Sequence, residues 1–236
     1  NLPPPPLRRY DRPGPRYTSD PTAPNFHAFT PADHVSAVQR SNTATPCAPL
    51  SLYVHAPFCA NPCFYCGCTR VITRDQGLIV RYLHVLLREI ELQGALFDRQ
   101  RPVEQLHFGG GTPTYFNDAQ LSAVFEQIER SFGFAAAERR EFSIEIDPRT
   151  VDAARLAQLV DLGINRISLG VQDFDPVVQA AVNRLQAPEL TETLVRCGRR
   201  HGLRSISFDL IYGLPRQTVE GFAQTLDRVI AAQPDR

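Results

Sequence analysis

The chain has 236 residues, 43% of them hydrophobic, and its 25 basic side chains balance its 25 acidic ones. This neutral balance argues against a nucleic-acid-binding surface, and the sequence has no apolar run of the ~20 residues needed to span a membrane. The hydrophobic content suffices for a buried core in one or two domains. Methionine is absent, even at position 1, and the chain stops directly after a helical pattern, so we expect a fragment of a longer protein.

Strand and helix patterns alternate along most of the chain. Residues 1–24 are rich in proline and lack helical periodicity, which predicts an extended arm. Beyond the arm, short runs of branched and aromatic residues predict strands at 50–55, 103–108, 142–146, 166–171 and 205–211. Repeated strand–helix units build a parallel sheet with right-handed crossovers. Composition alone does not distinguish a closed barrel from an open sheet.

Four segments between or after these strands have helical patterns. The clearest places six apolar side chains on one face: Ile79, Tyr82, Leu83, Leu86, Leu87 and Ile90. Asn117 followed by Gln120 has the spacing of a capping box and predicts a helix start. Two further helical faces are expected, at Leu156, Leu159 and Val160 and at Leu226, Val229 and Ile230.

Four cysteines lie within ten residues, shortly after the first expected strand: Cys59, Cys63, Cys66 and Cys68. The first three have the spacing to bind three irons of a 4Fe–4S cluster and leave the fourth iron open. A zinc site usually needs a second pair of ligands, which is missing here, and neighbouring thiols cannot all pair as disulfides without strain. We therefore favour an iron–sulfur site over zinc or a disulfide. The isolated Cys47 and Cys197 are expected to be small packing residues.

Polar residues also follow the other expected strands. A glycine triplet and Thr112 follow the second strand, Glu145 and Asp147 end the third, Gln172 and Asp173 follow the fourth, and Asp209 belongs to the fifth. In parallel α/β structures ligands bind at the carboxyl ends of the strands, so an active site is expected there. Alternation puts Ser143, Glu145 and Asp147 on one side of their strand. From the residues alone, Glu145 is equally well a carboxylate that its neighbours satisfy.

The C-x3-C-x2-C run, with an aromatic residue before its third cysteine, resembles the radical S-adenosylmethionine (radical SAM) superfamily. Cys68, the preceding run 55–59 (His-Ala-Pro-Phe-Cys) and the leading 14–19 (Gly-Pro-Arg-Tyr-Thr-Ser) are similar to the oxygen-independent coproporphyrinogen III oxidase family. The resemblance implies an α/β fold, a parallel partial (β/α)6 barrel, here with five βα units and an extended N-terminal arm. It assigns the arm and a leading helix to 1–48. It assigns a radical SAM core, incomplete at its C-terminal end, to 49–236, and it places the family's C-terminal domain outside this chain.

The resemblance also implies roles for individual residues. Cys59, Cys63 and Cys66 would bind the 4Fe–4S cluster, and Cys68 is a candidate catalytic residue. Contacts to S-adenosylmethionine, of which this family holds two molecules, are implied for Tyr53, Tyr65, Gly110, Gly111, Thr112, Glu145, Gln172, Arg184 and Asp209. The family often has phenylalanine at the position of Tyr65. A surface salt bridge remains an alternative for Arg184, and packing or hydrogen bonding is expected of His55 and His107.

The implied function is an oxidoreductase of haem biosynthesis. A 5′-deoxyadenosyl radical generated at the cluster would convert two propionates of coproporphyrinogen III to vinyl groups, giving protoporphyrinogen IX. The implied partners are this substrate and a reductant such as flavodoxin or ferredoxin, with no nucleic acid. Reduced thiols suggest a cytoplasmic location, and we expect a monomer. Two alternatives remain open, a haem-trafficking or haem-degrading relative and a non-catalytic iron–sulfur relay module.

Overall fold

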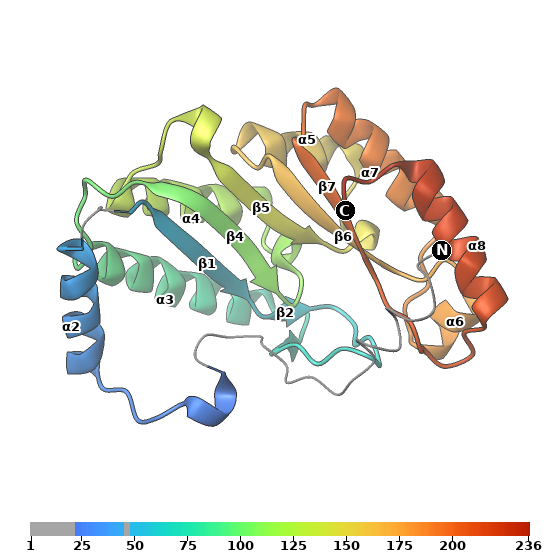
Figure 1. Ribbon diagram of the computed structural model, residues 1–236, viewed down its shortest axis with the longest axis horizontal. Helices are drawn as coiled ribbons and strands as arrows, with labels where there is room; N and C mark the ends of the chain where they lie inside the picture. The colour runs from blue at the N-terminus through green and yellow to red at the C-terminus, as the bar shows by residue number, and fades with distance from the viewer. Residues whose placement is uncertain (1–21, 45–47) are drawn as a thin grey trace, which may run out of the picture.

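The computed structural model describes residues 22–44 and 48–236. Its centre is a five-stranded parallel sheet in the order β1-β4-β5-β6-β7 (Figure 1). The strands are β1 (Leu50–Ala56), β4 (Val103–Gly110), β5 (Glu141–Ile146), β6 (Arg166–Gln172) and β7 (Ser205–Leu210). All five predicted strands are present, and their ends differ from the predicted ones by at most two residues. Two short strands, β2 (Phe58–Cys59) and β3 (Val71–Ile72), pair separately.

Each strand of the sheet is followed along the chain by one or two helices. They are α3 (Gln76–Gly94), α4 (Asp118–Phe132), α5 (Ala153–Asp161), α6 (Pro176–Ala181), α7 (Pro188–Arg200) and α8 (Val219–Ala232). Helices α3, α4, α5 and α7 lie behind the sheet in the view of Figure 1, and α8 lies beyond β7. The expected leading helix is α2 (Pro31–Asn42). Most of the predicted N-terminal arm, and Cys47, lie outside the described residues.

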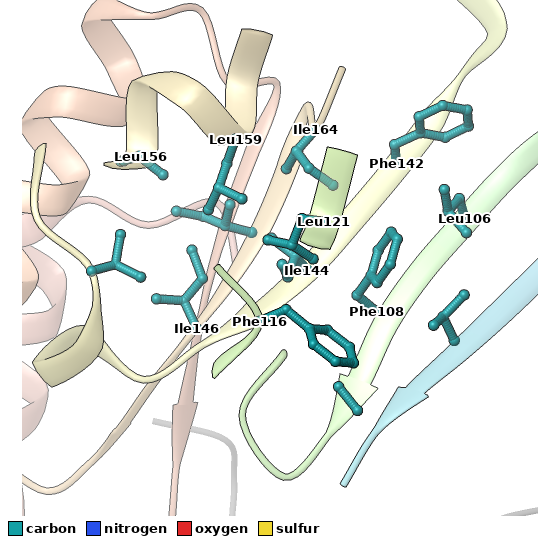
Figure 2. Packing of buried hydrophobic residues seen from close by; sticks show 14 of the residues in the cluster. Leu106, Phe108, Phe116, Leu121, Phe142, Ile144, Ile146, Leu156, Leu159 and Ile164 are labelled. Atoms are coloured by element: carbon teal, nitrogen blue, oxygen red, sulfur yellow. The ribbon is translucent and has the colours of Figure 1, made fainter. Parts of the chain in front are cut away.

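The main core lies between the sheet and the helices on its one covered face. On β5, Phe142, Ile144 and Ile146 are buried, whereas Ser143 and Glu145 on the opposite face are only half-buried. Figure 2 shows the β5 side chains packed against residues of α4 and α5. The predicted alternation along β5 is therefore confirmed, and it leaves a polar face of the sheet free to line a site.

Local capping explains where the helices begin. The Asn117 side chain accepts a hydrogen bond from the Gln120 N–H, and the Gln120 side chain accepts one from the Asn117 N–H, both at 2.9 Å. This is the predicted capping box at the start of α4.

The apolar face expected on α8 is only partly buried. Val229 packs on the core, whereas Ile230 is 71% exposed, because α8 flanks β7 at the rim of the sheet (Figure 1).

The edge of β7 carries one further contact. Past α8 the chain returns along β7, where the Asp235 N–H donates to the Ile206 carbonyl (2.8 Å) and the Phe208 N–H donates to the Arg236 carbonyl (2.9 Å). Residues 235–236 thus lie beside β7 with the hydrogen bonding of an adjacent strand.

Within the described residues, no helix is both long and apolar enough to cross a bilayer.

Candidate active site

The predicted site residues come together at the carboxyl ends of the sheet strands. A cavity of about 490 Å³ lies there. Its lining includes every predicted site residue except one: Cys59, Cys63, Tyr65, Cys66, Cys68, Gly110, Gly111, Thr112, Glu145, Gln172, Arg184 and Asp209. The exception, Tyr53, lies on the open face of β1. Its hydroxyl is hydrogen-bonded to His55 Nδ1 (2.9 Å), and its ring stacks on His107.

The loop that carries the cysteines, residues 59–70, runs from β2 across this end of the sheet towards α6 (Figure 1). Three consecutive residues after α6 hold it in place. The Val182 carbonyl accepts the Phe64 N–H (3.0 Å), and the Asn183 side-chain amide donates to the Pro62 carbonyl (2.7 Å). Arg184 Nη1 lies 3.5 Å from Cys63 Sγ. The cysteine loop therefore has a fixed position against the sheet.

The thiols of the loop are free and accessible from the cavity. Cys59, Cys63 and Cys66 are half-buried and Cys68 is exposed. Burial raises the pKa of the Cys59 thiol, and burial together with the neighbouring Cys66 raises the pKa of Cys68 to about 11. Metal binding at these sulfurs would therefore displace protons. By contrast, Cys197 is buried and donates to the Ala153 carbonyl, as expected of a packing residue.

The described residues contain no group of three His, Cys, Asp or Glu side chains placed to hold a single metal ion. A 4Fe–4S cluster does not need such a group, because each thiolate binds a different iron of the cube. The donor chemistry of the cavity fits such a cluster, because the free thiols of Cys59, Cys63 and Cys66 all line it and come from one short loop.

The glycine triplet allows β4 to end tightly against the first strand. Gly110 has φ +121°, and a Cβ atom there would lie 2.7 Å from the His55 ring. A Cβ atom on Gly111 would lie 2.8 Å from the Pro57 carbonyl oxygen. The N–H groups of Gly110 and Gly111 donate to Glu145 (3.2 Å) and to the Ala56 carbonyl (2.9 Å). These glycines are thus required for close backbone packing, and their N–H groups already have partners within the protein.

Glu145 on β5 and Asp209 on β7 both bring carboxylates to the cavity wall. Glu145 contacts His107 Nε2 (3.3 Å) in addition to Gly110, so part of its capacity is satisfied internally, as the alternative interpretation held. Its side chain remains 43% exposed. Asp209 accepts a hydrogen bond from Ser168 (2.8 Å), and burial, reinforced by the charge of Glu145, raises the pKa of Asp209. Both carboxylates suit the amino or hydroxyl groups of a polar ligand.

Arg184 is buried, so a surface salt bridge is the wrong interpretation of this residue. Its side chain is 8% exposed and pairs with Asp147, which is 11% exposed (Nη1–Oδ2 3.2 Å). Its Nη2 donates to the Gly170 carbonyl (2.8 Å). Asp147 also pairs with Arg149 (2.6 Å), a cavity residue that the sequence analysis did not select. The only local signal for this residue is its place directly after the third strand.

The contacts that residues 182–184 make with the cysteine loop, here called the clamp, give a first prediction. Asn183 has φ +56°, which alanine adopts at a cost of about 1–2 kcal/mol. We expect Asn183→Ala to lower the free energy of opening the cysteine loop by about 2 kcal/mol, from the backbone strain and the lost hydrogen bond together. Asn183→Gly loses only the hydrogen bond and should lower it by about 1 kcal/mol. The measurement is the rate of tryptic cleavage after Arg70, which should rise about fivefold in Asn183→Gly and about thirtyfold in Asn183→Ala, since about 1.4 kcal/mol corresponds to a factor of ten. Gln233→Ala is the control, because Gln233 has a similar φ of 53° at the end of α8; equal cleavage in all variants would contradict the clamp.

Comparison with known proteins places this geometry in a family. The radical SAM superfamily model matches residues 53–229. The chain is 52% identical over 231 residues to the oxygen-independent coproporphyrinogen III oxidase of Pseudomonas aeruginosa and 46% identical over 231 residues to that of Escherichia coli K12. Each alignment covers 98% of this chain and 50% or 49% of the relative, so the chain spans about half the length of the curated relatives it matches.

Solved structures agree with this placement. The coproporphyrinogen III oxidase HemN of Escherichia coli, described as a radical SAM enzyme, superposes with a TM-score of 0.87 at 45% identity, covering 97% of this chain and 50% of that one. The methyltransferase TsrM of Kitasatospora setae is 17% identical with a TM-score of 0.55, covers 86% of this chain and 37% of that one, and shows the fold alone. The predicted α/β fold and resemblance are confirmed, and the chain belongs to the radical SAM superfamily.

Proposed function

We propose that the protein containing this chain is an oxygen-independent coproporphyrinogen III oxidase. It would decarboxylate two propionate side chains of coproporphyrinogen III oxidatively to vinyl groups, giving protoporphyrinogen IX. The observation that carries the proposal is that one cavity brings four free thiols together with Glu145, Gln172, Arg184 and Asp209. The names of relatives at 42–52% identity supply the substrate.

The residues of the cavity have distinct parts in this function. Cys59, Cys63 and Cys66 would hold the 4Fe–4S cluster, and Glu145, Gln172, Arg184 and Asp209, with Tyr65 and the 110–112 segment, would hold S-adenosylmethionine. When bound, these cofactors supply the 5′-deoxyadenosyl radical that removes hydrogen from a propionate. The half-buried side chains on the open face of β5 and the fixed cysteine loop would orient the reactants and limit the access of water.

The remaining parts of the proposal concern the rest of the protein. Residues 1–48 would form an arm and helix, and 49–236 most of a radical SAM core. The contacts of residues 235–236 with β7 support a sixth strand along that edge. A reductant such as flavodoxin or ferredoxin would deliver the electron to a monomer in the cytoplasm. Tyr53, outside the cavity, would support the first cofactor through His55, and Cys68 would act on the substrate side of the cluster.

The test is anaerobic reconstitution of the full-length protein with iron and sulfide. We expect an electron paramagnetic resonance (EPR) signal of the reduced 4Fe–4S cluster that changes when S-adenosylmethionine is added, and a vinyl porphyrinogen as product. A signal indifferent to S-adenosylmethionine would indicate a relay module. A responsive signal without conversion of coproporphyrinogen III would indicate a haem-handling relative. A well-folded protein without a cluster would contradict the proposal.

A further inference from the structure

A group of three charged side chains, of which Arg184 is buried and Asp147 and Arg149 are half-buried, lies at the carboxyl end of β5, against the cysteine loop. Arg149 grips Asp147 with two nitrogens: Nε lies 2.9 Å from Oδ1 and Nη2 lies 2.6 Å from Oδ2. Arg184 Nη1 reaches the same Oδ2 at 3.2 Å. Bidentate pairing of this kind fixes the plane of the Arg149 guanidinium, whereas the guanidinium of an unpaired arginine would be free to rotate.

Both guanidinium groups also face one sulfur. Arg184 Nη1 lies 3.5 Å and Arg149 Nη2 3.8 Å from Cys63 Sγ. Hydrogen bonds from Arg149 and the charges of Arg184 and Arg149 outweigh the burial of Asp147 and keep its pKa below its ordinary value, so the carboxylate is ionised at neutral pH. Two cations and one anion leave the group with a net charge of +1. At these distances, and with side chains 8–25% exposed, solvent ions screen this charge little.

We infer that Arg149, held by Asp147 and acting with Arg184 on the Cys63 sulfur, raises the reduction potential of the cluster. The inference rests on the proposed function, because it takes Cys63 as a cluster ligand. Reduction adds one electron, supplied by the proposed flavodoxin or ferredoxin, and therefore one negative charge to the cluster. A fixed cation beside a ligating sulfur stabilises the reduced form, since hydrogen bonds and charge at the sulfurs set such potentials.

Substitutions in this group should shift the reduction potential of the cluster in opposite directions. Arg149→Gln lowers the net charge of the group from +1 to 0 and should make reduction harder. Asp147→Asn keeps the shape of the side chain, raises the net charge from +1 to +2 and should make reduction easier. A purely structural role would not give opposite shifts, because both substitutions disturb the same contacts. Arg149→Lys, which keeps the charge but loses the fork, should lie between wild type and Arg149→Gln.

A second arginine of similar burial serves as the matched control. Arg155 pairs with Asp118 (3.3 Å) and has a side chain that is 23% exposed, against 25% for Arg149, but it does not line the cavity. Arg155→Gln therefore removes a carboxylate-paired cation without changing the charge beside Cys63. Its cluster should have the wild-type potential.

The experiment is a redox titration of the reconstituted full-length protein, followed by EPR at matched iron and sulfide content. At a fixed potential we expect the ratio of reduced to oxidised cluster to fall about tenfold in Arg149→Gln, equivalent to about 59 mV for a one-electron couple, and to rise in Asp147→Asn. Equal potentials in wild type and both variants, or shifts of the same sign, would overturn the inference and leave the proposed function intact. If Arg149→Gln binds no cluster, Asp147→Asn decides alone. Absence of a cluster from the wild type contradicts the proposed function and the inference with it.

Discussion

Cys63→Ser is expected to bind no 4Fe–4S cluster and to lose turnover by roughly three orders of magnitude or more, the range that loss of an essential catalytic group produces. Iron–sulfur clusters are held by thiolates, and a serine hydroxyl remains protonated and binds iron poorly at neutral pH. The Cys63 sulfur also lies against Arg184 and Arg149, which hold it at a fixed place in the cavity wall. Iron and sulfide content after anaerobic reconstitution and desalting measure the effect.

Two other cysteines make this result specific. Cys197→Ser should keep full iron content, because Cys197 is buried on α7 and contacts the Ala153 carbonyl rather than the cavity. Cys68→Ser should keep the cluster but lose turnover, since Cys68 is exposed at the cavity and the other three loop cysteines suffice for an open-iron cluster. Loss of iron from Cys68→Ser would make Cys68 a ligand. Full iron content in Cys63→Ser would contradict the proposed ligand set.

Much of this site could be predicted because its signals are local. A strand with alternating burial shows which of its side chains face the open side, as Ser143 and Glu145 do on β5. A parallel sheet then brings the carboxyl ends of its strands to one edge, so residues after different strands meet without further information. The cysteine spacing is equally local, because one short loop supplies all the predicted ligands. The capping box at Asn117 is contained in four residues.

The remaining parts of the site depend on contacts between distant segments. Arg184 meets Cys63 across 121 residues of sequence, and Arg149 meets it across 86. Apart from its place after the third strand, nothing near Arg149 in the sequence distinguishes it from an exposed arginine, the usual state of this residue. The position of Tyr53 outside the cavity likewise involves a distant contact, the stacking of its ring on His107. Such contacts require the three-dimensional fold.

A second large effect is expected at the end of β6, where Asp173 is 1% exposed. Its Oδ1 accepts hydrogen bonds from the Thr225 hydroxyl (2.6 Å) and from the Asp175 N–H (2.9 Å), and its Oδ2 accepts one from Gln217 Nε2 (2.5 Å). One carboxylate thus ties β6 to α8 and to the loop after β7. We expect Asp173→Ala to lower the free energy of unfolding by about 3 kcal/mol or more, because each hydrogen bond to a charged group contributes about 1.5–3 kcal/mol and the buried donors lose their acceptor.

Asp173→Asn distinguishes the hydrogen bonds from the volume of the side chain. Its oxygen can still accept from Thr225, but its new NH2 group must then face the Gln217 NH2 group. Gln217 cannot turn its amide to compensate, since its Oε1 already accepts the Gly213 N–H at 2.6 Å. We therefore expect a loss of about 1–3 kcal/mol, the cost of a buried donor without an acceptor. Urea unfolding followed by circular dichroism measures both variants, with the exposed Asp161→Ala expected within about 0.5 kcal/mol of wild type. Wild-type stability of Asp173→Asn would mean that the loop after β7 can rearrange around Gln217, and so that Asp173 does not fix its position.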